Sequence, residues 1–315
     1  MKKFGFVFPG QGSQKKGMLA AIAAENPIIQ ASFAESSEAL GLDLWNICTA
    51  DEEGLLDQTH ITQPALLTAS VALWRLWRQQ GGALPELLAG HSLGEYSALV
   101  CAEVLSLADA AVLVHKRGRY MQDAVPAGTG AMAAILGLDD ERIQTLCDTV
   151  ANGEIVAPAN FNSTGQTVIA GNSAAVERAM AACKEAGAKR ALLLNVSVPS
   201  HCALMKPAAE KLAAELEQVA FQAPKVPVVQ NINGRVARNP DDIKQNLLKQ
   251  LYLPVQWVET IGCMWDFGIS QLVECGPGKV LGGLIKRIEP EIETFSTEDP
   301  ESFAQVCAAI TRQVQ

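Results

Sequence analysis

The chain contains 315 residues, of which 49% are hydrophobic and 19% are charged, and this composition excludes a disordered or fibrous protein. Its formal net charge of −9 argues against a nucleic-acid-binding protein, because phosphate contacts need a basic surface. The length predicts about two domains.

No uncharged apolar run approaches the roughly 18 residues of a membrane span, so we expect no membrane association. The apolar stretch after Lys2 and Lys3 is too short for a signal peptide, and we expect a cytoplasmic protein. The eight cysteines are scattered without a Cys-x-x-Cys pair. This pattern favours buried or free thiols over a disulfide framework or zinc site, and no bound metal is predicted.

The first third of the chain alternates between strand and helix patterns. Residues Phe4–Phe8 form a short apolar run typical of a strand, and Pro64–Gln79 have helical apolar spacing that Gly81 and Gly82 end. Residues Leu87–Ala89 then predict a strand that enters the turn Gly90-His-Ser-Leu-Gly94, after which a helix pattern begins at Glu95. This alternation indicates an α/β fold with a mostly parallel sheet.

The middle of the chain has the element order β-α-β-β-α-β, which is the ferredoxin-like signature. The predicted strands are 131–136, 154–161, 167–170 and 190–198, and the predicted helices are 139–150 and 172–186, the second capped by Asn172. We therefore expect a small domain over 128–198, inserted into a large domain formed by 1–127 and 199–315. The alternative is one continuous α/β sheet.

The last third returns to α/β alternation. Helices are predicted over 203–219 and 241–251, and strands over 226–231 and 272–275. The second strand enters the turn Gly276-Pro-Gly-Lys279, and a helical stretch follows.

The turn around Ser92 matches the Gly-x-Ser-x-Gly pattern of a nucleophile elbow. A nucleophile on a sharp strand-to-helix turn crowds its neighbours, and the flanking glycines Gly90 and Gly94 relieve that crowding. The backbone N–H of Leu93 then points toward the developing oxyanion. The position between a strand and a helix favours this interpretation over a loop serine between two glycines.

The general base is sought among four histidines. His60 lies in a polar stretch and His115 on a charged helix segment, and both are expected at the surface. His91 adjoins Ser92 and is expected to pack against or orient the elbow. His201 follows an apolar run at a strand end, where enzymes built on sheets place site residues, and it is the predicted base. The alternative is a hydrogen-bonded loop histidine.

An acidic third member of a catalytic triad is missing. No histidine follows residue 201, and no acid before it stands out, so the order indicates a Ser–His dyad whose imidazole N–H is held by a backbone carbonyl. Cys202 could rival Ser92, but nothing around it suggests a lowered thiol pKa, and a buried thiol is the preferred interpretation.

The glycine-rich turn Pro9-Gly-Gln-Gly-Ser-Gln14 follows the first strand. Such turns gather at the carboxyl edge of a parallel sheet, so the N–H of Gln11 is the candidate second oxyanion donor. The turn is not a dinucleotide fingerprint, because Lys15 fills the last glycine position, and Met18 stands where a phosphate-binding loop needs lysine.

Arg117 lies inside the apolar arc of its helix. On a wheel of about 100° per residue, it falls between Leu113 and Val114, whereas Lys116 and Arg119 fall on the far side. A guanidinium that faces a core needs a partner. That partner is either a structural carboxylate or a carboxylate of the substrate held in a bidentate fork, and the wheel leaves both open.

Five motifs occur in one order: Phe8-Pro-Gly-Gln-Gly-Ser-Gln14, Gly90-His-Ser-Leu-Gly-Glu95, Arg117-Gly-x-x-Met121, Val198-Pro-Ser-His201 and Gln250-Leu-Tyr-x-Pro-Val-Gln-Trp257. Together they resemble, over essentially the whole chain, the malonyl-CoA:acyl carrier protein transacylases of bacterial fatty acid synthesis. The resemblance implies an α/β-hydrolase-like large domain with a ferredoxin-like insert. It also implies Ser92 as nucleophile, His201 as base, and the N–H groups of Gln11 and Leu93 as oxyanion hole.

The resemblance further implies that the backbone carbonyl of Gln250 orients the histidine and that Arg117 binds the malonyl carboxylate. The remaining residues that we place at the substrate site are Gln63, Met121, His91, Ser200, Asn160, Asn162 and Gln166. In related polyketide enzymes, the residue that matches Ser200 helps to size the α-substituent.

The implied reaction moves a malonyl group from malonyl-CoA to the phosphopantetheine thiol of acyl carrier protein through a malonyl-serine ester. Coenzyme A and phosphopantetheine thioesters are substrates, so no bound cofactor is expected. Because carrier proteins are acidic, we expect a local basic surface near the mouth of the site, with Lys189, Arg190, Lys286 and Arg287 as candidates and a solvated face as the alternative.

Three other functions share parts of this pattern. A serine thioesterase or esterase would use the elbow but would not need Arg117. A malonyl transferase of polyketide synthesis or malonate decarboxylation would use the same chemistry with another partner. A carrier-protein docking module with a vestigial site would form no covalent adduct at Ser92.

Overall fold

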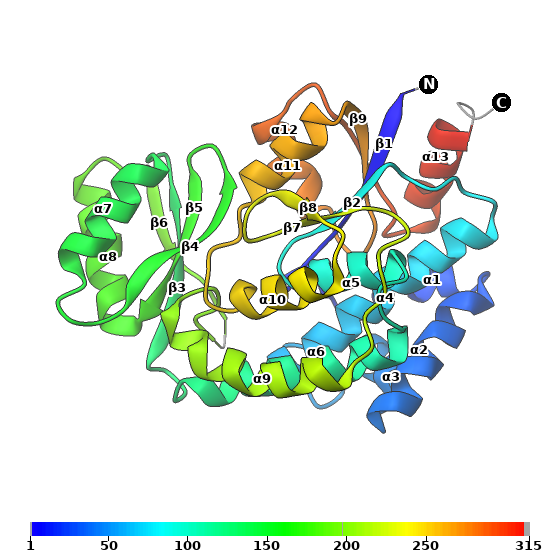
Figure 1. Ribbon diagram of the computed structural model, residues 1–315, viewed down its shortest axis with the longest axis horizontal. Coiled ribbons are helices and arrows are strands. Elements are labelled where there is room, and N and C mark those ends of the chain that lie inside the picture. Colours follow the sequence, from blue (N-terminus) through cyan, green and yellow to red (C-terminus); the bar gives the residue numbers. More distant parts are fainter. Residues whose placement is uncertain (1, 197, 312–315) are drawn as a thin grey trace.

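The computed structural model describes residues 2–196 and 198–311, and its strands form two sheets. The larger sheet has six strands in the order β10 (Glu293–Ser296), β9 (Ile269–Glu274), β1 (Lys3–Phe8), β2 (Leu87–Gly90), β7 (Val228–Gln230) and β8 (Arg235–Ala237). The smaller sheet has four strands in the order β4 (Val156–Ser163), β5 (Gln166–Asn172), β3 (Gly130–Leu136) and β6 (Arg190–Leu193). The chain thus has a mixed α/β fold, with the smaller sheet in a lobe at the left of Figure 1.

The larger sheet is parallel except for β8, which pairs antiparallel with β7. Helices cover both of its faces, and its central strands are therefore buried on both sides and rich in apolar residues. Phe8 pairs with Gly90 in the β1–β2 register, so the loops that follow these two strands begin side by side at the carboxyl edge. This edge is where open α/β sheets bind ligands.

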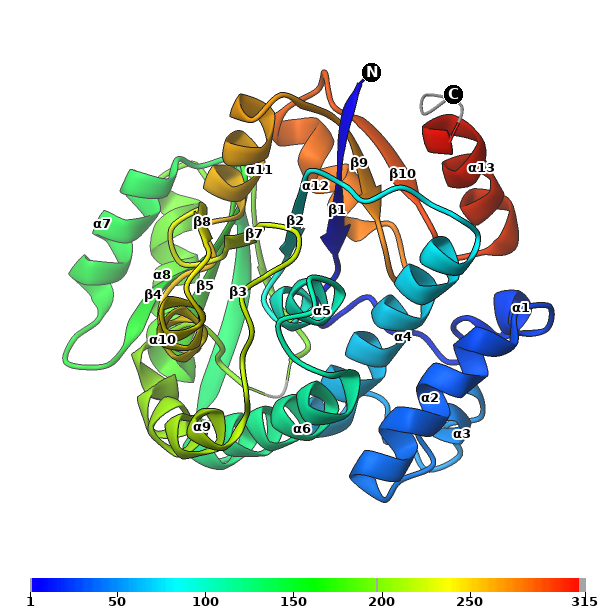
Figure 2. The same ribbon diagram turned by 45° about the vertical axis from the view of Figure 1, so that its right-hand side comes forward.

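The two faces of the larger sheet have separate cores. Phe6 and Phe8 belong to the first core, whose helices are α1 (Ala20–Ala23), α2 (Pro27–Leu40), α3 (Leu44–Thr49), α4 (Thr59–Gln79), α5 (Gly94–Cys101), α6 (Leu107–Ala124), α9 (Lys206–Gln218), α10 (Pro240–Gln250) and α13 (Pro300–Thr311). Val7 belongs to the second core, together with α11 (Trp257–Asp266) and α12 (Val280–Ile288). In both views α6 and α9 run next to each other below the sheet (Figure 2).

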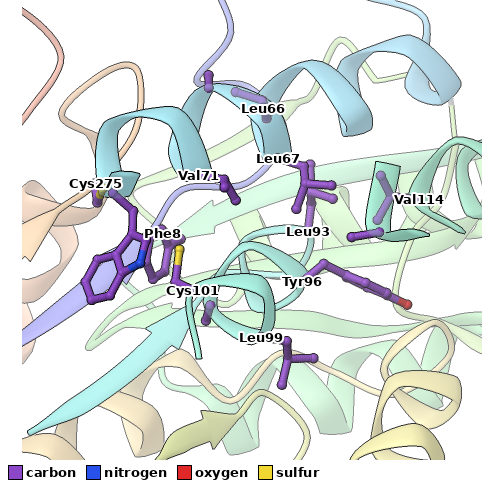
Figure 3. Close-up of a cluster of buried hydrophobic side chains, with 14 of the residues drawn as sticks. Phe8, Leu66, Leu67, Val71, Leu93, Tyr96, Leu99, Cys101, Val114 and Cys275 are labelled. Atoms are coloured by element: carbon purple, nitrogen blue, oxygen red, sulfur yellow. The ribbon is translucent and has the colours of Figure 1, made fainter. Parts of the chain in front are cut away.

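Part of the first core anchors the segment that carries Ser92. Figure 3 shows Leu93 and Tyr96 among apolar side chains of β1, α4, α5 and α6. Leu93 is 1% exposed and Tyr96 is 0% exposed. The close packing of these side chains fixes the turn before α5, which is what a preorganised site requires.

The smaller sheet is antiparallel throughout. Helices α7 (Asp140–Val150) and α8 (Ser173–Glu185) pack on one of its faces. On the other face Met132, Val168 and Cys202 share a small core, and main-chain bonds from Phe161 to Val255 and from Val255 to Ala159 join β4 to the segment before α11. The smaller sheet therefore lies against the carboxyl edge of the larger one.

The predicted elements are present, with shifted limits and omissions. The helix predicted from Pro64 begins at Thr59, because most of the residues between Thr59 and Pro64 are also buried. The strand predicted over 190–198 ends at Leu193, and the N–H of Val196 then bonds the carbonyl of Leu194 in a turn; residue 197 lies outside the described residues. Elements α1–α3, β8, α11, β10 and α13 were not predicted from the sequence.

Asn172 precedes α8 as predicted, but it does not cap that helix. Its Oδ1 accepts a hydrogen bond from the N–H of Ile155 at 2.8 Å, and the side chain caps no N–H of α8. Asn172 therefore joins β5 to the segment before β4.

Within residues 2–196 and 198–311, no helix combines the length and apolar character that crossing a membrane would require.

Candidate active site

A pocket of about 530 Å³ lies where the smaller sheet meets the carboxyl edge of the larger sheet. The loop after β1, the turn after β2, helix α6 and helix α12 line one part of it, and β4, β5 and the loop after β6 line the other. Among the residues predicted at the site, those lining this pocket are Gln11, His91, Ser92, Leu93, Arg117, Met121, Asn160, Asn162, Gln166, Ser200 and His201.

Ser92 occupies a strained turn between β2 and α5. Its φ angle of 52° lies in the left-handed region, which is uncommon for a residue with a side chain. A Cβ on Gly90 would clash with the backbone of Gly94, and a Cβ on Gly94 would clash with the carbonyl of Phe8. The two glycines are therefore required by close backbone approach, as the Gly-x-Ser-x-Gly spacing predicts.

Ser92 and His201 form a hydrogen-bonded pair. The distance from Ser92 Oγ to His201 Nε2 is 2.8 Å, and His201 Nδ1 lies 2.6 Å from the main-chain carbonyl oxygen of Gln250. Because a carbonyl only accepts, Nδ1 carries the proton and Nε2 is free to accept one from the serine. Burial and the positive charge of Arg117 lower the pKa of His201 to about 3, so the imidazole is neutral near pH 7.

Two backbone N–H groups at the pocket are free to bind an oxyanion. The neighbouring donors are used: Ser13 N–H bonds the carbonyl of Gly10, Gly12 N–H bonds the side chain of Gln14, and Ser92 N–H bonds Asn231. Within the described part of the chain, the N–H groups of Gln11 and Leu93 have no such acceptor. Both residues line the pocket next to Ser92.

Arg117 is a buried charged group that lines the pocket with the dyad. It is 1% exposed, which confirms that it faces the core, whereas Arg119 is exposed. Its Nη1 donates to Gln63 Oε1 at 2.7 Å and its Nη2 donates to Gln250 Oε1 at 3.1 Å. No carboxylate forms a salt bridge with it among residues 2–196 and 198–311. A carboxylate therefore does not contact Arg117 directly in the described residues, although the charge of the buried Glu95 acts on it.

Gln63 and Gln250 stand behind the pocket rather than in its wall. Both side chains are essentially inaccessible, at 1% and 0% exposed, and both contact Arg117. Gln63 Nε2 also lies 3.6 Å from the sulfur of Met121. Gln63 does not line the pocket itself but holds the guanidinium that does, and its place at the substrate site stays a prediction.

The pocket rim contains the predicted polar residues of the smaller sheet. Asn162 on β4 accepts a hydrogen bond from His91 Nε2 at 2.7 Å, and the ring of His91 packs edge-on against Trp257. Burial lowers the pKa of His91, which favours the neutral imidazole. Gln166 on β5 accepts a hydrogen bond from Arg287 of α12.

The remaining histidines and Cys202 take no part in this pocket. His60 and His115 are half-buried rather than exposed, because their rings stack edge-on and His115 Nδ1 bonds the carbonyl of His60 at 2.7 Å. Cys202 is 2% exposed, and burial raises the pKa of its thiol to about 11. It is therefore an inert buried thiol, as predicted.

Two buried polar residues that the sequence analysis missed connect the site. Asn231 accepts the N–H of Ser92 at 2.7 Å and donates to the carbonyl of Gly90 at 2.6 Å. Glu95 accepts hydrogen bonds from the N–H of Asn231 and from Gln250 Nε2. Glu95 follows the elbow directly in the sequence, and this adjacency is the signal that could have pointed to it. Among the described residues, no group of His, Cys, Asp and Glu could hold a metal ion.

Comparison with known proteins gives one consistent set of relatives. Residues 5–281 match the acyl transferase domain family. The malonyl CoA-acyl carrier protein transacylase of Escherichia coli K12 is 58% identical over 304 residues, which cover 96% of this chain and 98% of that protein. An acyl carrier protein S-malonyltransferase structure from Vibrio cholerae has a TM-score of 0.95 at 55% identity and covers 96% of this chain and 99% of its own.

A second solved structure contains a carrier protein. It is a malonyl-transacylase in complex with a type II polyketide acyl-carrier protein, with a TM-score of 0.96 and 53% identity, and the match covers 98% of this chain and 99% of that one.

Proposed function

The chain belongs to the acyl transferase family, and within it to the malonyl-CoA:acyl carrier protein transacylases, and from this we propose that it transfers malonyl groups from malonyl-CoA to acyl carrier protein in fatty acid synthesis. The single observation in this chain that best supports malonyl transfer is the position of Arg117. A neutral Ser–His pair and a buried guanidinium without a carboxylate partner among the described residues open into one pocket. A serine hydrolase has no need of such a group, whereas a malonyl thioester brings a carboxylate to it.

In the first half-reaction, Ser92 Oγ attacks the thioester carbonyl of malonyl-CoA while His201 Nε2 takes the serine proton. The carbonyl of Gln250 keeps the proton on Nδ1 and thereby supports the imidazolium that forms. The N–H groups of Gln11 and Leu93 bind the negative oxygen of the tetrahedral intermediate. Its collapse breaks the carbon–sulfur bond, and His201 returns the proton to the leaving thiolate of coenzyme A.

In the second half-reaction, the phosphopantetheine thiol of acyl carrier protein replaces coenzyme A. His201 takes the thiol proton, the sulfur attacks the malonyl-serine ester, and collapse returns the proton to Ser92. Coenzyme A and phosphopantetheine thus enter as substrates, and the proposed reaction uses no bound cofactor or metal. The complex of a related transacylase with a polyketide carrier protein supports the same chemistry.

We also propose that the chain has two domains. A ferredoxin-like unit over 128–198 is inserted into an α/β-hydrolase-like domain over 1–127 and 199–315. The strand order β4-β5-β3-β6 and the antiparallel pairing support the ferredoxin-like description. The parallel sheet with Ser92 after β2 supports the second description.

The proposed function is tested by intact-mass measurement of the chain after mixing with malonyl-CoA. We expect a single malonyl adduct that disappears when phosphopantetheinylated acyl carrier protein is added, with a matching mass gain on the carrier protein. Free malonate without a carrier-protein adduct would instead support a thioesterase. The absence of any adduct and of any turnover would support a docking module.

The predicted basic residues lie outside the pocket lining, on two segments that approach the pocket residue Gln166. Leu136 pairs with Arg190 on one side and with Gln166 on the other, and Gln166 in turn contacts Arg287 of α12. Lys189, Arg190, Lys286 and Arg287 are all exposed. This cluster offers an acidic carrier protein a positive surface although the whole chain is negative.

We expect the double charge reversal Lys286→Glu with Arg287→Glu to raise the KM for acyl carrier protein about tenfold at low salt, with a smaller effect at high salt because added salt screens exposed charges. The rate of Ser92 malonylation by malonyl-CoA should stay unchanged, since Gln166 and the dyad remain. The matched control is Lys211→Glu, an exposed lysine on α9 that does not line the pocket. An unchanged KM in the double variant would contradict the docking role.

A further inference from the structure

Glu95 is a buried carboxylate directly beneath the site. It is the second residue of α5, it is 1% exposed, and it does not line the pocket. Its Oε2 accepts hydrogen bonds from the N–H of Asn231 at 3.0 Å and from Gln250 Nε2 at 2.8 Å, and its Oε1 has no partner among the described residues. These donors belong to other elements, so Glu95 is not a cap of its own helix.

Burying a carboxylate costs desolvation free energy, which hydrogen bonds and nearby positive charge offset only in part. Burial raises the pKa of Glu95 to about 7, against the lowering effects of the two hydrogen bonds and of the positive charge of Arg117. Leucine or methionine would fill the same space without this cost. The carboxylate must therefore serve a role that an apolar side chain cannot.

The partner that Glu95 holds is the amide of Gln250. Its Nε2 donates to Glu95 and, at 3.1 Å, to the main-chain carbonyl of Ser92, while its Oε1 accepts from Arg117 Nη2 at 3.1 Å. A carboxylate and a carbonyl only accept, and a guanidinium only donates. Glu95 and the Ser92 carbonyl therefore hold the amide nitrogen on their side, with Glu95 as the shorter contact, and the amide oxygen faces Arg117.

We propose that Glu95 is the positioning residue that gives the site its preference for malonyl over uncharged acyl groups, because it fixes the Gln250 amide that aims Arg117. The proposal rests on the proposed function and deepens it. Without Glu95, the Gln250 amide nitrogen keeps only the Ser92 carbonyl as an acceptor and is held less firmly. Whenever the amide turned its nitrogen toward the guanidinium, two donors would face each other, and Arg117 would lose one of the two amide oxygens that orient it.

Glu95 takes part in two separate hydrogen-bond paths, and each path predicts a different effect of its removal on the acylation rates. Through Asn231 it supports the N–H of Ser92, which serves every acyl group alike. Through Gln250 it supports Arg117, which serves only an acyl group with a carboxylate. A purely structural role would lower both acylation rates by the same factor, whereas the proposed role lowers the malonyl rate further.

The test measures the rate of Ser92 acylation by malonyl-CoA and by acetyl-CoA and compares their ratio between variants. We expect Glu95→Ala to lower this ratio about tenfold, the size of one lost hydrogen bond to a charged group. Glu95→Gln should keep the ratio within about threefold, since its amide oxygen can still accept from Asn231 and Gln250. In the Arg117→Ala background, Glu95→Ala should leave the ratio unchanged, because the group through which it acts is gone.

The matched control is Glu274, a second glutamate at 1% exposure whose carboxylate accepts the N–H groups of Leu281 and Gly282 and has no link to Arg117. Glu274→Ala should lower both rates equally. If Glu95→Ala does not fold by thermal melting, Glu95→Asp carries the test, because its shorter side chain keeps the charge but draws back from Gln250.

An unchanged ratio in whichever of Glu95→Ala and Glu95→Asp folds, or a ratio that still falls in the Arg117→Ala background, would overturn the role of Glu95. A wild-type chain that forms no malonyl adduct would instead overturn the proposed function itself. The two failures are thus distinguished by the wild-type measurement.

Discussion

Replacing Ser92 with alanine is expected to abolish the malonyl adduct and to lower malonyl transfer by a factor on the order of 10⁶, the loss found when a serine nucleophile is removed from a comparable dyad or triad. His201 then has no hydroxyl proton to accept, and no covalent intermediate can form. The fold should survive, because alanine keeps the same Cβ in the strained conformation at φ 52° and removes only the oxygen that bonds His201.

Intact-mass measurement with malonyl-CoA checks this expectation, and Ser97→Ala is its matched control. Ser97 lies on α5, the helix that follows Ser92, and it is buried and does not line the pocket. Ser97→Ala should keep the adduct. A malonyl adduct on Ser92→Ala would contradict the assignment and would direct the search to another nucleophile. Cys202 would be a weak candidate, because burial raises the pKa of its thiol to about 11.

The sequence predicted the elements whose local hydrophobic pattern matches their burial in the fold. The strand before Ser92, the four strands of the smaller sheet and the two helices that pack on it have clear apolar periods, and the structure contains them. The short strands β8 and β10 were missed because they are edge strands with little buried apolar surface. Helix α2 was missed although Pro27 begins it, since Ser32 and Ser36 interrupt its apolar face and are buried through bonds to a carbonyl and to Thr68.

The site residues also divide into those that local sequence predicts and those whose roles depend on long-range contacts. Glycine spacing identified Ser92 and elimination among four histidines identified His201, because both arguments use local sequence. Arg117 was found on a helical wheel for the same reason. The roles of Asn231 and of the Gln250 side chain depend on contacts with residues more than a hundred positions away, which no local pattern encodes. For Gln63, the sequence indicates a position near the site but not whether the side chain faces the pocket or Arg117.

The environment of Arg117 supports the proposed selection of an anionic acyl group. The guanidinium has left water and directly contacts two amide oxygens and the face of the Tyr96 ring, and the carboxylate that acts on it, Glu95, forms no salt bridge with it. A buried cation with incomplete compensation is costly, and a carboxylate that binds it in a water-excluded pocket therefore gains strongly. Acetyl groups offer nothing to Arg117. In the proposed reaction, the malonyl carboxylate would therefore supply the direct ionic contact that the free chain does not give Arg117 among its described residues.

Arg117→Ala is accordingly expected to lower kcat/KM for malonyl-CoA about 10²–10³-fold, the range typical of truncating one partner of a buried charged pair. Acylation by acetyl-CoA should change by less than about threefold, because Ser92, His201 and the oxyanion donors are untouched. Arg117→Lys should restore the malonyl rate only in part, since an ammonium keeps the charge but cannot form the planar two-point contact.

The matched control is Arg119→Ala, which removes an exposed arginine from the same helix and should leave both rates unchanged. Rates of adduct formation measured by mass for the two acyl-CoA substrates decide the outcome. If Arg117→Ala lowered the malonyl and acetyl rates by equal factors, Arg117 would support the fold of the site rather than bind the substrate. A malonyl-specific loss, by contrast, would place the substrate carboxylate on Nη1 and Nη2, where Gln63 and Gln250 already hold the fork in position.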